Sequence, residues 1–455
     1  MIPFRYIDRF LIFFGFVFLT GALQAMLTTF DSTTGGINSS GNRNIQIVSA
    51  IIYVPTVFLI VHRIEGFLNL VSKNIILFIF LSLPVFSVFW SLAPDVTARR
   101  VSALIGTMLF ISYAAVALSP RQALRTMAVA FGAITLGCLV FAVALPGIGT
   151  HEAGPYEGVW RGLFHHKNKF GGMMALAATT IAICPKYSKA EILSGRICAS
   201  IAVFLVFMSQ SKTALIMLVC LLLAVPAVHW VSGRGRRTVE RIFVVAFLGS
   251  VLLAITVQNT SNILEMLGKD ETLTGRTETW NMAWDRVLDR PILGYGYRVF
   301  WTDKSPARLG AVEGWRDDIS HAHNSYLDLA LDLGFVGVGG FIVIVFIFMK
   351  RLTGVILKRK DPISLWMFTF MLYMIIVGIT GRSILEQSEI VWSIFILSYM
   401  YLSMNKTDTS NKQNASEMPN SFQQPIVRLG RPTPASHSKD LQSYLMPGKR
   451  YGEGR

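Results

Sequence analysis

Residues 10–27 read FLIFFGFVFLTGALQAML, a run without a single charged side chain. A run of about 20 apolar residues is long enough to cross the hydrocarbon core of a bilayer as an α-helix. Such runs recur along most of the chain, so the sequence predicts an all-α polytopic membrane protein with about twelve transmembrane helices. The predicted spans are residues 10–27, 45–61, 74–90, 101–118, 127–145, 170–184, 197–208, 214–230, 242–257, 335–349, 365–380 and 390–402.

The composition agrees with a membrane protein. The 455 residues are 52% hydrophobic and only 15% charged, whereas soluble domains are about 25% charged. The four cysteines lie in or beside apolar runs, which predicts small buried side chains rather than disulfides or metal ligands. They are Cys138, Cys184, Cys198 and Cys220.

The net charge of +15 is distributed unevenly along the chain. In membrane proteins Lys and Arg gather in the cytoplasmic loops. If the N-terminus is cytoplasmic, the strongly basic segments 234–241 and 350–360 both fall on the cytoplasmic side. The pattern therefore predicts that both termini are cytoplasmic, and it accounts for the positive charge without a nucleic-acid partner.

The order of the apolar runs divides the chain into four parts. Residues 1–257 hold the first nine predicted helices, and residues 258–334 form one large polar loop on the outer side. Residues 335–402 hold the last three helices. Residues 403–455 are rich in Ser, Asn, Gln, Pro and Lys, which predicts a disordered cytoplasmic tail with too few apolar residues to form a core.

The large outer loop is predicted to contain short amphipathic helices. Residues 278–288 place Trp280, Trp284 and either Val287 or Leu288 on one helical face, and a proline soon follows. The next segment, up to residue 301, is rich in Gly, Tyr and Trp, which favour the headgroup layer. We therefore expect the loop to lie along the outer membrane surface.

A second helix is predicted over residues 324–333, with Asn324 as its N-cap and Gly334 as its C-cap. His323 then lies directly before a helix N-terminus, where the partial positive charge disfavours a protonated imidazole. A neutral imidazole can accept a proton, so His323 is the candidate general base.

Two other interpretations of His321 and His323 stay open. They could be a surface pair without a chemical role. They could also bind a metal together with Asp317 or Asp318, although the sequence has no helical metal motif such as HExxH.

Basic residues mark further polar clusters. Arg276 precedes a helix start, where an Arg and exposed backbone N–H groups together form an anion site. Lys212 lies in a polar run between two apolar runs, which favours a cation in a water-accessible cavity over a side chain that merely snorkels to the interface. Arg161 and Arg382 each lie in another polar segment, the latter with Glu386 and Glu389. In the predicted topology all these clusters face the outer side, which predicts one outward-facing polar site.

Five short motifs, in this order, give the chain a family resemblance. They are RGLFHHKN at residues 161–168, SQSKT at 209–213, GRTETW at 275–280, PILGYG at 291–296, and HNSYL at 323–327 followed by Gly334. The ordered set resembles the O-antigen ligase and polymerase superfamily of bacterial inner-membrane glycan transferases. Within it, the chain is most similar to exopolysaccharide polymerases of the succinoglycan type.

The resemblance implies a substrate and a reaction. Such an enzyme polymerises oligosaccharide repeat units linked to undecaprenyl diphosphate, at the periplasmic face of the inner membrane, without metal or other cofactor. An acceptor hydroxyl attacks the anomeric carbon and the lipid diphosphate leaves. By this analogy His323 takes the acceptor proton, while Arg276 and Lys212 hold the diphosphate.

Further substrate contacts are expected from the other residues of the outward-facing site. These are Arg161, His321, Asn324 and Arg382. Expected partners are the membrane lipids, with chain-length regulators and export proteins as further candidates.

Two alternative functions stay open. The first is a ligase that transfers a lipid-linked glycan to a lipid A core or another acceptor. The second is a transporter of lipid-linked sugars or a subunit of an export complex. A transporter is expected to show paired half-repeats, and none is visible in the sequence.

Overall fold

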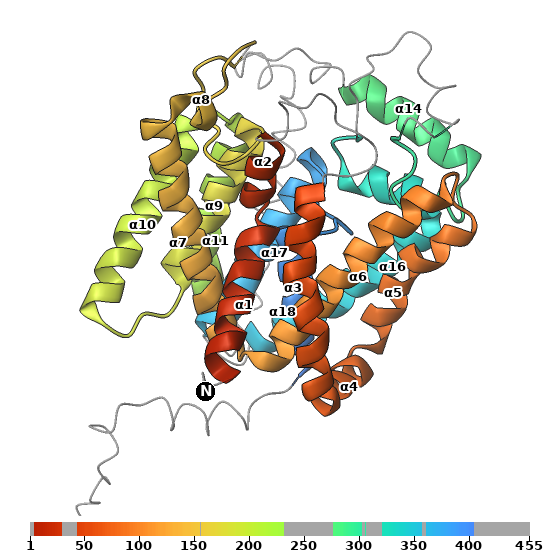
Figure 1. Cartoon of the computed structure of the whole chain (residues 1–455), viewed down its shortest axis with the longest axis horizontal. Helices are drawn as coiled ribbons and strands as arrows, with labels where there is room; N and C mark the ends of the chain where they lie inside the picture. Colours follow the sequence, from red (N-terminus) through yellow and green to blue (C-terminus); the bar gives the residue numbers. More distant parts are fainter. Residues whose placement is uncertain are drawn as a thin grey trace, which may run out of the picture. The chain divides into compact units, whose positions relative to one another are not determined.

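The computed structural model describes residues 4–29, 43–154, 156–231, 276–302, 305, 321–356 and 361–404. Over these residues the predicted all-α class is confirmed, since their one β-type contact is an isolated bridge between Thr150 and Trp160. Figure 1 labels the helices. They are α1 (Phe4–Leu19), α2 (Ala22–Thr29), α3 (Arg43–His62), α4 (Ile64–Lys73), α5 (Ile75–Phe86), the 3-10 helix η2 (Ser87–Phe89), α6 (Pro94–Ala117), α7 (Pro120–Ala144), α8 (Pro146–Gly149), α9 (Lys167–Ile183), α10 (Lys189–Met208), α11 (Lys212–Val231), α14 (Arg276–Asp289), α16 (Ser325–Ile356), α17 (Pro362–Thr380) and α18 (Ile390–Ser403).

Six of these helices are long and apolar enough to cross a membrane, namely α3, α6, α7, α10, α16 and α17. Two bent pairs raise the number to eight if each pair forms one span. Helices α1 and α2 meet at 63°, and α4 meets the α5–η2 segment at 92°. The predicted run 242–257 lies outside the described residues, so the full set of twelve spans stays a prediction.

Helices α9 and α18 lie inside the protein rather than against lipid. Residues 170–181 of α9 and residues 390–401 of α18 are all buried. A helix that is apolar on every side and buried on every side is a core helix. This explains why α18, with 14 residues, is shorter than a full span.

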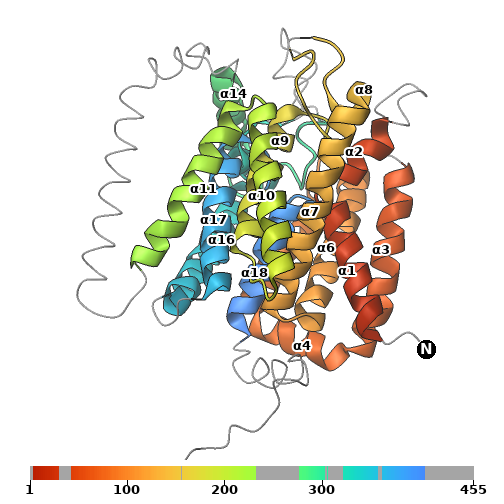
Figure 2. The ribbon, with the colours of Figure 1, turned by 90° about the vertical axis from the view of Figure 1, so that its left-hand side faces the viewer.

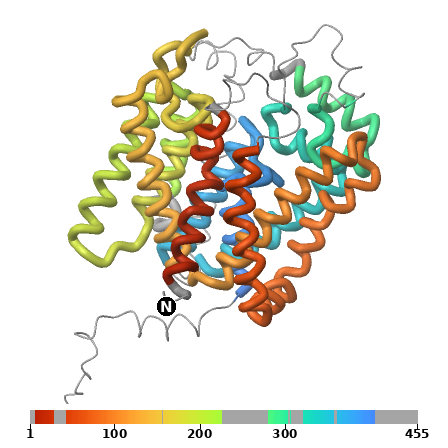
Figure 3. The backbone as a smooth tube through the Cα atoms, in the orientation of Figure 1, coloured from red at the N-terminus to blue at the C-terminus, as the bar shows by residue number. Residues whose placement is uncertain are grey.

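The two ends of the helical unit differ. In Figures 1 and 2, α2, α8 and α14 lie at one end, whereas α4 and the start of α1 lie at the other. The tube in Figure 3 shows α1 running beside α7, and these two helices are in contact. We refer to the end with α2, α8 and α14 as the site end, because the polar clusters described below gather there.

Helix α16 is broken at Gly334, whose backbone adopts φ 64° and ψ −163°. The segment Pro291–Gly296 fills the break with its backbone. The N–H groups of Tyr295 and Gly296 donate to Leu331 O (2.8 Å) and Asp332 O (3.0 Å). On the other side, the N–H groups of Phe335 and Val336 donate to Pro291 O (2.7 Å) and Ile292 O (3.2 Å).

An interrupted helix is tolerated at membrane depth where neighbouring groups satisfy the freed backbone. Gly334 therefore adopts the left-handed conformation that is typical of the predicted C-cap. The chain nevertheless resumes its helix at once, so the first turns of α16 point in a direction set by the PILGYG motif.

The aromatic segment that follows α14 is inserted into the protein, and its predicted place along the membrane surface stays a prediction. Tyr297 and Phe300 are both fully buried. The N–H of Tyr297 donates to Ser87 Oγ (3.0 Å), and its hydroxyl donates to Leu385 O (2.6 Å). Gly296 makes this insertion possible, because a Cβ at its φ of +103° would lie 2.6 Å from Ser91 Cα.

Helix α14 forms as predicted and ends at Asp289, but its buried face was predicted only in part. Ala283 and Val287 are fully buried, while Trp284 and Leu288 are 46% and 55% exposed. The buried stripe thus runs through the small residue Ala283, which allows α14 to pack closely on α16.

Replacing Gly334 with alanine is expected to lower thermal stability in detergent. A Cβ at this left-handed position would lie 2.2 Å from Ile292 O, and a non-glycine residue with incompatible backbone angles costs more than about 1 kcal/mol. Gly339→Ala is the matched control, because no heavy atom lies within 4 Å of its added Cβ. Equal melting temperatures for the two variants would show that the break does not depend on glycine.

Candidate functional site

The turn that carries the two histidines begins α16. Asn324 Oδ1 accepts from the N–H groups of Tyr326 (3.0 Å) and Leu327 (3.3 Å), which confirms Asn324 as the N-cap. His323 has a left-handed φ of 52°. The rings of His321 and His323 lie with centroids 4.0 Å apart and an interplanar angle of 46°. Both histidines are half-buried.

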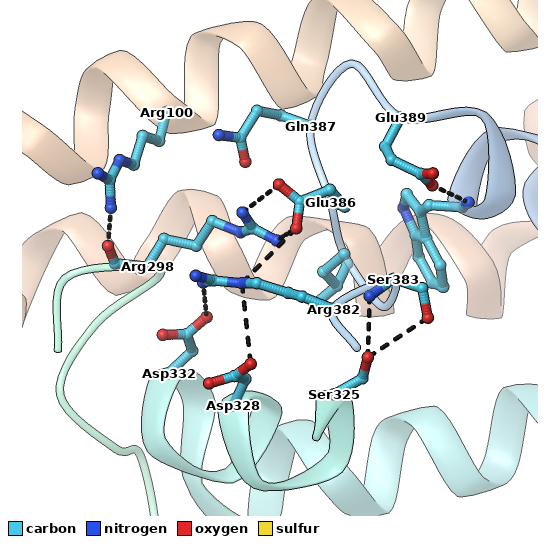
Figure 4. A network of polar contacts seen from close by, with 12 residues as sticks. Arg100, Arg298, Ser325, Asp328, Asp332, Arg382, Ser383, Glu386, Gln387 and Glu389 are labelled. Atoms are coloured by element: carbon cyan, nitrogen blue, oxygen red, sulfur yellow. Dashed lines mark hydrogen bonds and ion pairs between the residues drawn. The ribbon is translucent and has the colours of Figure 1, made fainter. Parts of the chain in front are cut away.

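This turn is joined to the loop between α17 and α18 (residues 381–389). Ser325 Oγ donates to Gly381 O (2.9 Å) and accepts from the N–H of Ser383 (2.8 Å). The close-up in Figure 4 shows Ser325 facing Ser383, with Arg382 beside them. Two predicted clusters, His321–Asn324 and Arg382, are therefore brought together.

A network of ion pairs lies next to this junction (Figure 4). The guanidinium of Arg298 forms a two-pronged pair with Glu386, and Arg298 is only 5% exposed. Arg382 lies 3.6 Å from Asp332 and from Glu386, and 4.0 Å from Asp328. These three contacts exceed hydrogen-bond length, so Arg382 is held mainly by charge.

Glu386 favours its charged form although it is buried. Burial raises the pKa of Glu386, but Arg298 and Arg382 lower it by more, so the net pKa lies below its usual value. Burial raises the pKa of Glu389 to about 7, against the opposing charge of Lys169. Glu389 also caps α18 by accepting from the N–H groups of Val391 (2.7 Å) and Trp392 (3.2 Å).

Sequence reasoning missed three members of the network: Arg298, Asp328 and Asp332. The two aspartates were placed off the apolar stripe of their helix, yet they are only 3% and 6% exposed. The available signal was the pair of acids one turn apart in a helix that continues into an apolar run. Ionisable residues in such a place are buried only with partners, and these partners come from distant segments.

The segments 161–168 and 209–213 also meet. Ser211 Oγ donates to Asn168 Oδ1 (2.9 Å), and Lys167 Nζ lies 3.5 Å from Gln210 O. Burial and the nearby charge of Lys212 both lower the pKa of Lys167. Lys212 itself is exposed and is the first residue of α11.

Lys169 connects the two halves of the site electrostatically. It lies in the first turn of α9, and its charge lowers the pKa of both Glu386 and Glu389. His165, four residues earlier, lies 2.8 Å from Thr28 Oγ1 through its Nε2. The site end therefore has a histidine–Arg382 half and a Lys167–Lys212 half, with Lys169 between them.

The structure describes the remaining predicted residues only in part. Arg161 Nε donates to Ile148 O (3.1 Å) and Thr150 O (2.8 Å), so this atom holds its own loop. Arg276 is the first residue of α14, but its side chain lies outside the described part. Asp317 and Asp318, the predicted alternative metal ligands, also lie outside it. All four cysteines are free.

Comparison with known proteins agrees with the motif order. Residues 197–342 match the family model described as O-antigen ligase. The predicted family resemblance is confirmed. The match covers the second part of α10, all of α11 and α14, and the first part of α16, and so includes Lys212, Arg276 and His323.

Two relatives are similar to parts of this chain. The chain is 23% identical over 301 residues to the exopolysaccharide production protein ExoQ of Rhizobium meliloti (strain 1021), covering 62% of this chain and 66% of that one. It is 26% identical over 126 residues to a predicted polysaccharide ligase, RC0486, of Rickettsia conorii (strain ATCC VR-613 / Malish 7), covering 27% and 30%. The chain thus spans less than two thirds of the length of these relatives, and its apolar helices agree with a multi-pass membrane protein.

Proposed function

We propose that the protein polymerises undecaprenyl-diphosphate-linked oligosaccharide repeat units into exopolysaccharide at the periplasmic face of the bacterial inner membrane. The observation that carries this proposal is the close His321–His323 pair at the start of α16, within the segment that matches the family model. A half-buried imidazole beside a buried ionic network suits proton transfer from a hydroxyl group.

The reaction is a metal-independent glycosyl transfer. His323 accepts the proton of the acceptor hydroxyl while its oxygen forms a bond to the anomeric carbon of the donor glycan. The bond from that carbon to the lipid diphosphate breaks, and the electron pair stays on the leaving diphosphate. Arg276 and Lys212 stabilise this developing negative charge, an effect that is strongest in a poorly solvated site.

The positions of these two cations favour the role. Arg276 opens α14 and Lys212 opens α11. A helix N-terminus carries a partial positive charge, so each cation is supported by its own helix in binding an anion. Arg161, His321, Asn324 and Arg382 are proposed as further substrate contacts around the diphosphate and the glycan.

The proposed orientation places the site end in the periplasm and both termini in the cytoplasm. It is supported by the start of α1, which lies at the end opposite to α14 (Figure 1). The large loop 258–334 would then supply the catalytic segment. A chain-length regulator and export proteins are proposed as partners of the growing polymer.

A ligase is the second candidate. It is favoured by the description of the matched family as O-antigen ligase and by the Rickettsia relative. The chemistry at the donor is the same, and only the acceptor differs.

The lipid-linked glycans of a deletion strain distinguish the candidates. We expect single repeat units to accumulate on the lipid carrier, because the polymerising step is lost. Complete chains left on the carrier would instead indicate a ligase. Repeat units that a membrane-impermeant oxidant cannot reach in spheroplasts would indicate a transporter and would contradict the proposal.

A further inference from the structure

Ala322, the residue between the two histidines, is held on both sides of its backbone. Its N–H donates to Asp328 Oδ1 (3.1 Å), and its carbonyl accepts from the indole Nε1 of Trp280 (2.9 Å). Ala322 is fully buried. Its backbone is therefore fixed by one residue of α14 and one residue of α16.

Asp328 is well suited to hold this turn. The same Oδ1 accepts from the indole Nε1 of Trp301 (2.8 Å), while Oδ2 lies 4.0 Å from Arg382 Nε. Hydrogen bonds to an ionised acceptor are about twice as strong as neutral ones. Asp328 is only 3% exposed and Trp301 only 7%, so water competes little for these bonds.

The two hydrogen bonds of the Ala322 backbone matter because the backbone of the next residue, His323, is strained. A left-handed φ is unfavourable for a residue with a Cβ, and His323 has a φ of 52°. Strain of this kind persists only where the surroundings determine the conformation. Fixing both peptide groups of Ala322 fixes the directions from which the rings of His321 and His323 leave the backbone.

We propose that Asp328 is a positioning residue, which acts through the N–H of Ala322 to hold the imidazole of His323 in its reactive orientation. Trp280 fixes Ala322 from the opposite side, through the hydrogen bond to its carbonyl. The proposal rests on the proposed role of His323 as the base. Asp328 itself does not touch the substrate.

The chain offers a matched control for the charge of Asp328. Asp332 lies one turn further along α16, is equally buried, and also faces Arg382, at 3.6 Å. It makes no bond to the histidine turn among the described residues. Asp332→Ala therefore removes a carboxylate from Arg382 without releasing Ala322, whereas Asp328→Ala does both. Asp328→Asn keeps an oxygen acceptor for Ala322 and Trp301.

The test uses the full chain in proteoliposomes, with the lipid-linked glycan extracted from the deletion strain as the probe. Three quantities are measured for each variant: kcat, KM and the rate of hydrogen exchange of the backbone amide of Ala322. We expect Asp328→Ala to lower kcat about ten- to a hundredfold, with KM changed less than about threefold, because a misplaced base impairs chemistry rather than binding.

Exchange at Ala322 should become at least about tenfold faster in Asp328→Ala, since one hydrogen bond to a charged group is lost. Asp328→Asn should recover most of kcat. Asp332→Ala should leave exchange at Ala322 unchanged. Trp280→Phe, which removes the indole N–H and keeps an aromatic ring, should lower kcat several-fold, and it is the variant to use if Asp328→Ala does not insert into membranes.

Wild-type kcat in Asp328→Ala, or in Trp280→Phe where the former does not insert, would overturn the proposal. Equal loss of kcat in the Asp328 and Asp332 alanine variants, with unchanged exchange at Ala322, would overturn it as well. An active His323→Ala enzyme would instead overturn the proposed function, and the exchange data would still show whether Asp328 holds the turn.

Discussion

Replacing His323 with alanine is expected to abolish polymer formation in a complemented deletion strain. Without the imidazole, no group at this position takes the proton of the attacking hydroxyl, and general-base catalysis contributes about 10²–10⁴ in rate. Polymer is measured in the culture and in membranes, at matched levels of inserted protein. Membrane insertion should be unchanged, because His323 is half-buried and is not part of the apolar core.

His321→Ala serves as the neighbouring comparison and should be milder. The ring of His321 lies against that of His323, with centroids 4.0 Å apart, so its loss removes a ring contact but leaves the base in place. Near-normal polymer in the His323→Ala strain would contradict the general-base role. A stronger defect in His321→Ala than in His323→Ala would exchange the roles of the two histidines.

Replacing Arg276 or Lys212 with alanine is expected to lower the turnover of lipid-linked glycan about 10²–10³-fold each, by analogy with the loss of one oxyanion donor. Each change leaves part of the charge of the diphosphate uncompensated. Arg276→Lys should also lower turnover, because a point charge cannot replace the planar, two-pronged guanidinium. Lys212→Arg should be tolerated best, since it keeps the charge.

Lys189→Ala is the matched control for Lys212. Lys189 opens α10 as Lys212 opens α11, but it follows the turn at the other end of α9. Its loss should leave turnover unchanged. Chelators should have no effect on the purified enzyme. A requirement for a divalent cation, with activity retained in both alanine variants, would favour the metal interpretation of His321, His323 and Asp317.

Local features of this protein follow from the sequence itself. Apolar runs become helices because a chain in lipid must satisfy its backbone hydrogen bonds within each segment. The cap at Asn324, the left-handed residue at Gly334 and the end of α14 at Asp289 were predicted because their causes lie within a few residues. The order of the five motifs was likewise sufficient to predict the family resemblance.

Only the tertiary structure decided which apolar helices face protein and which face lipid. Lipid tails and protein interiors are equally apolar, so hydropathy does not separate α9 and α18 from the outer spans. The burial of residues 294–301 also depends on distant partners, such as Ser87 and Leu385.

The same distinction holds within the candidate site. The sequence was sufficient to single out His323, because a histidine before a helix start has a local electrostatic meaning. Arg298 pairs with Glu386, which lies 88 residues away. This pair and the two hydrogen bonds of the Ala322 backbone arise from segments that meet only after folding. Buried charges are stable only where such partners converge, and this convergence is a property of the tertiary structure.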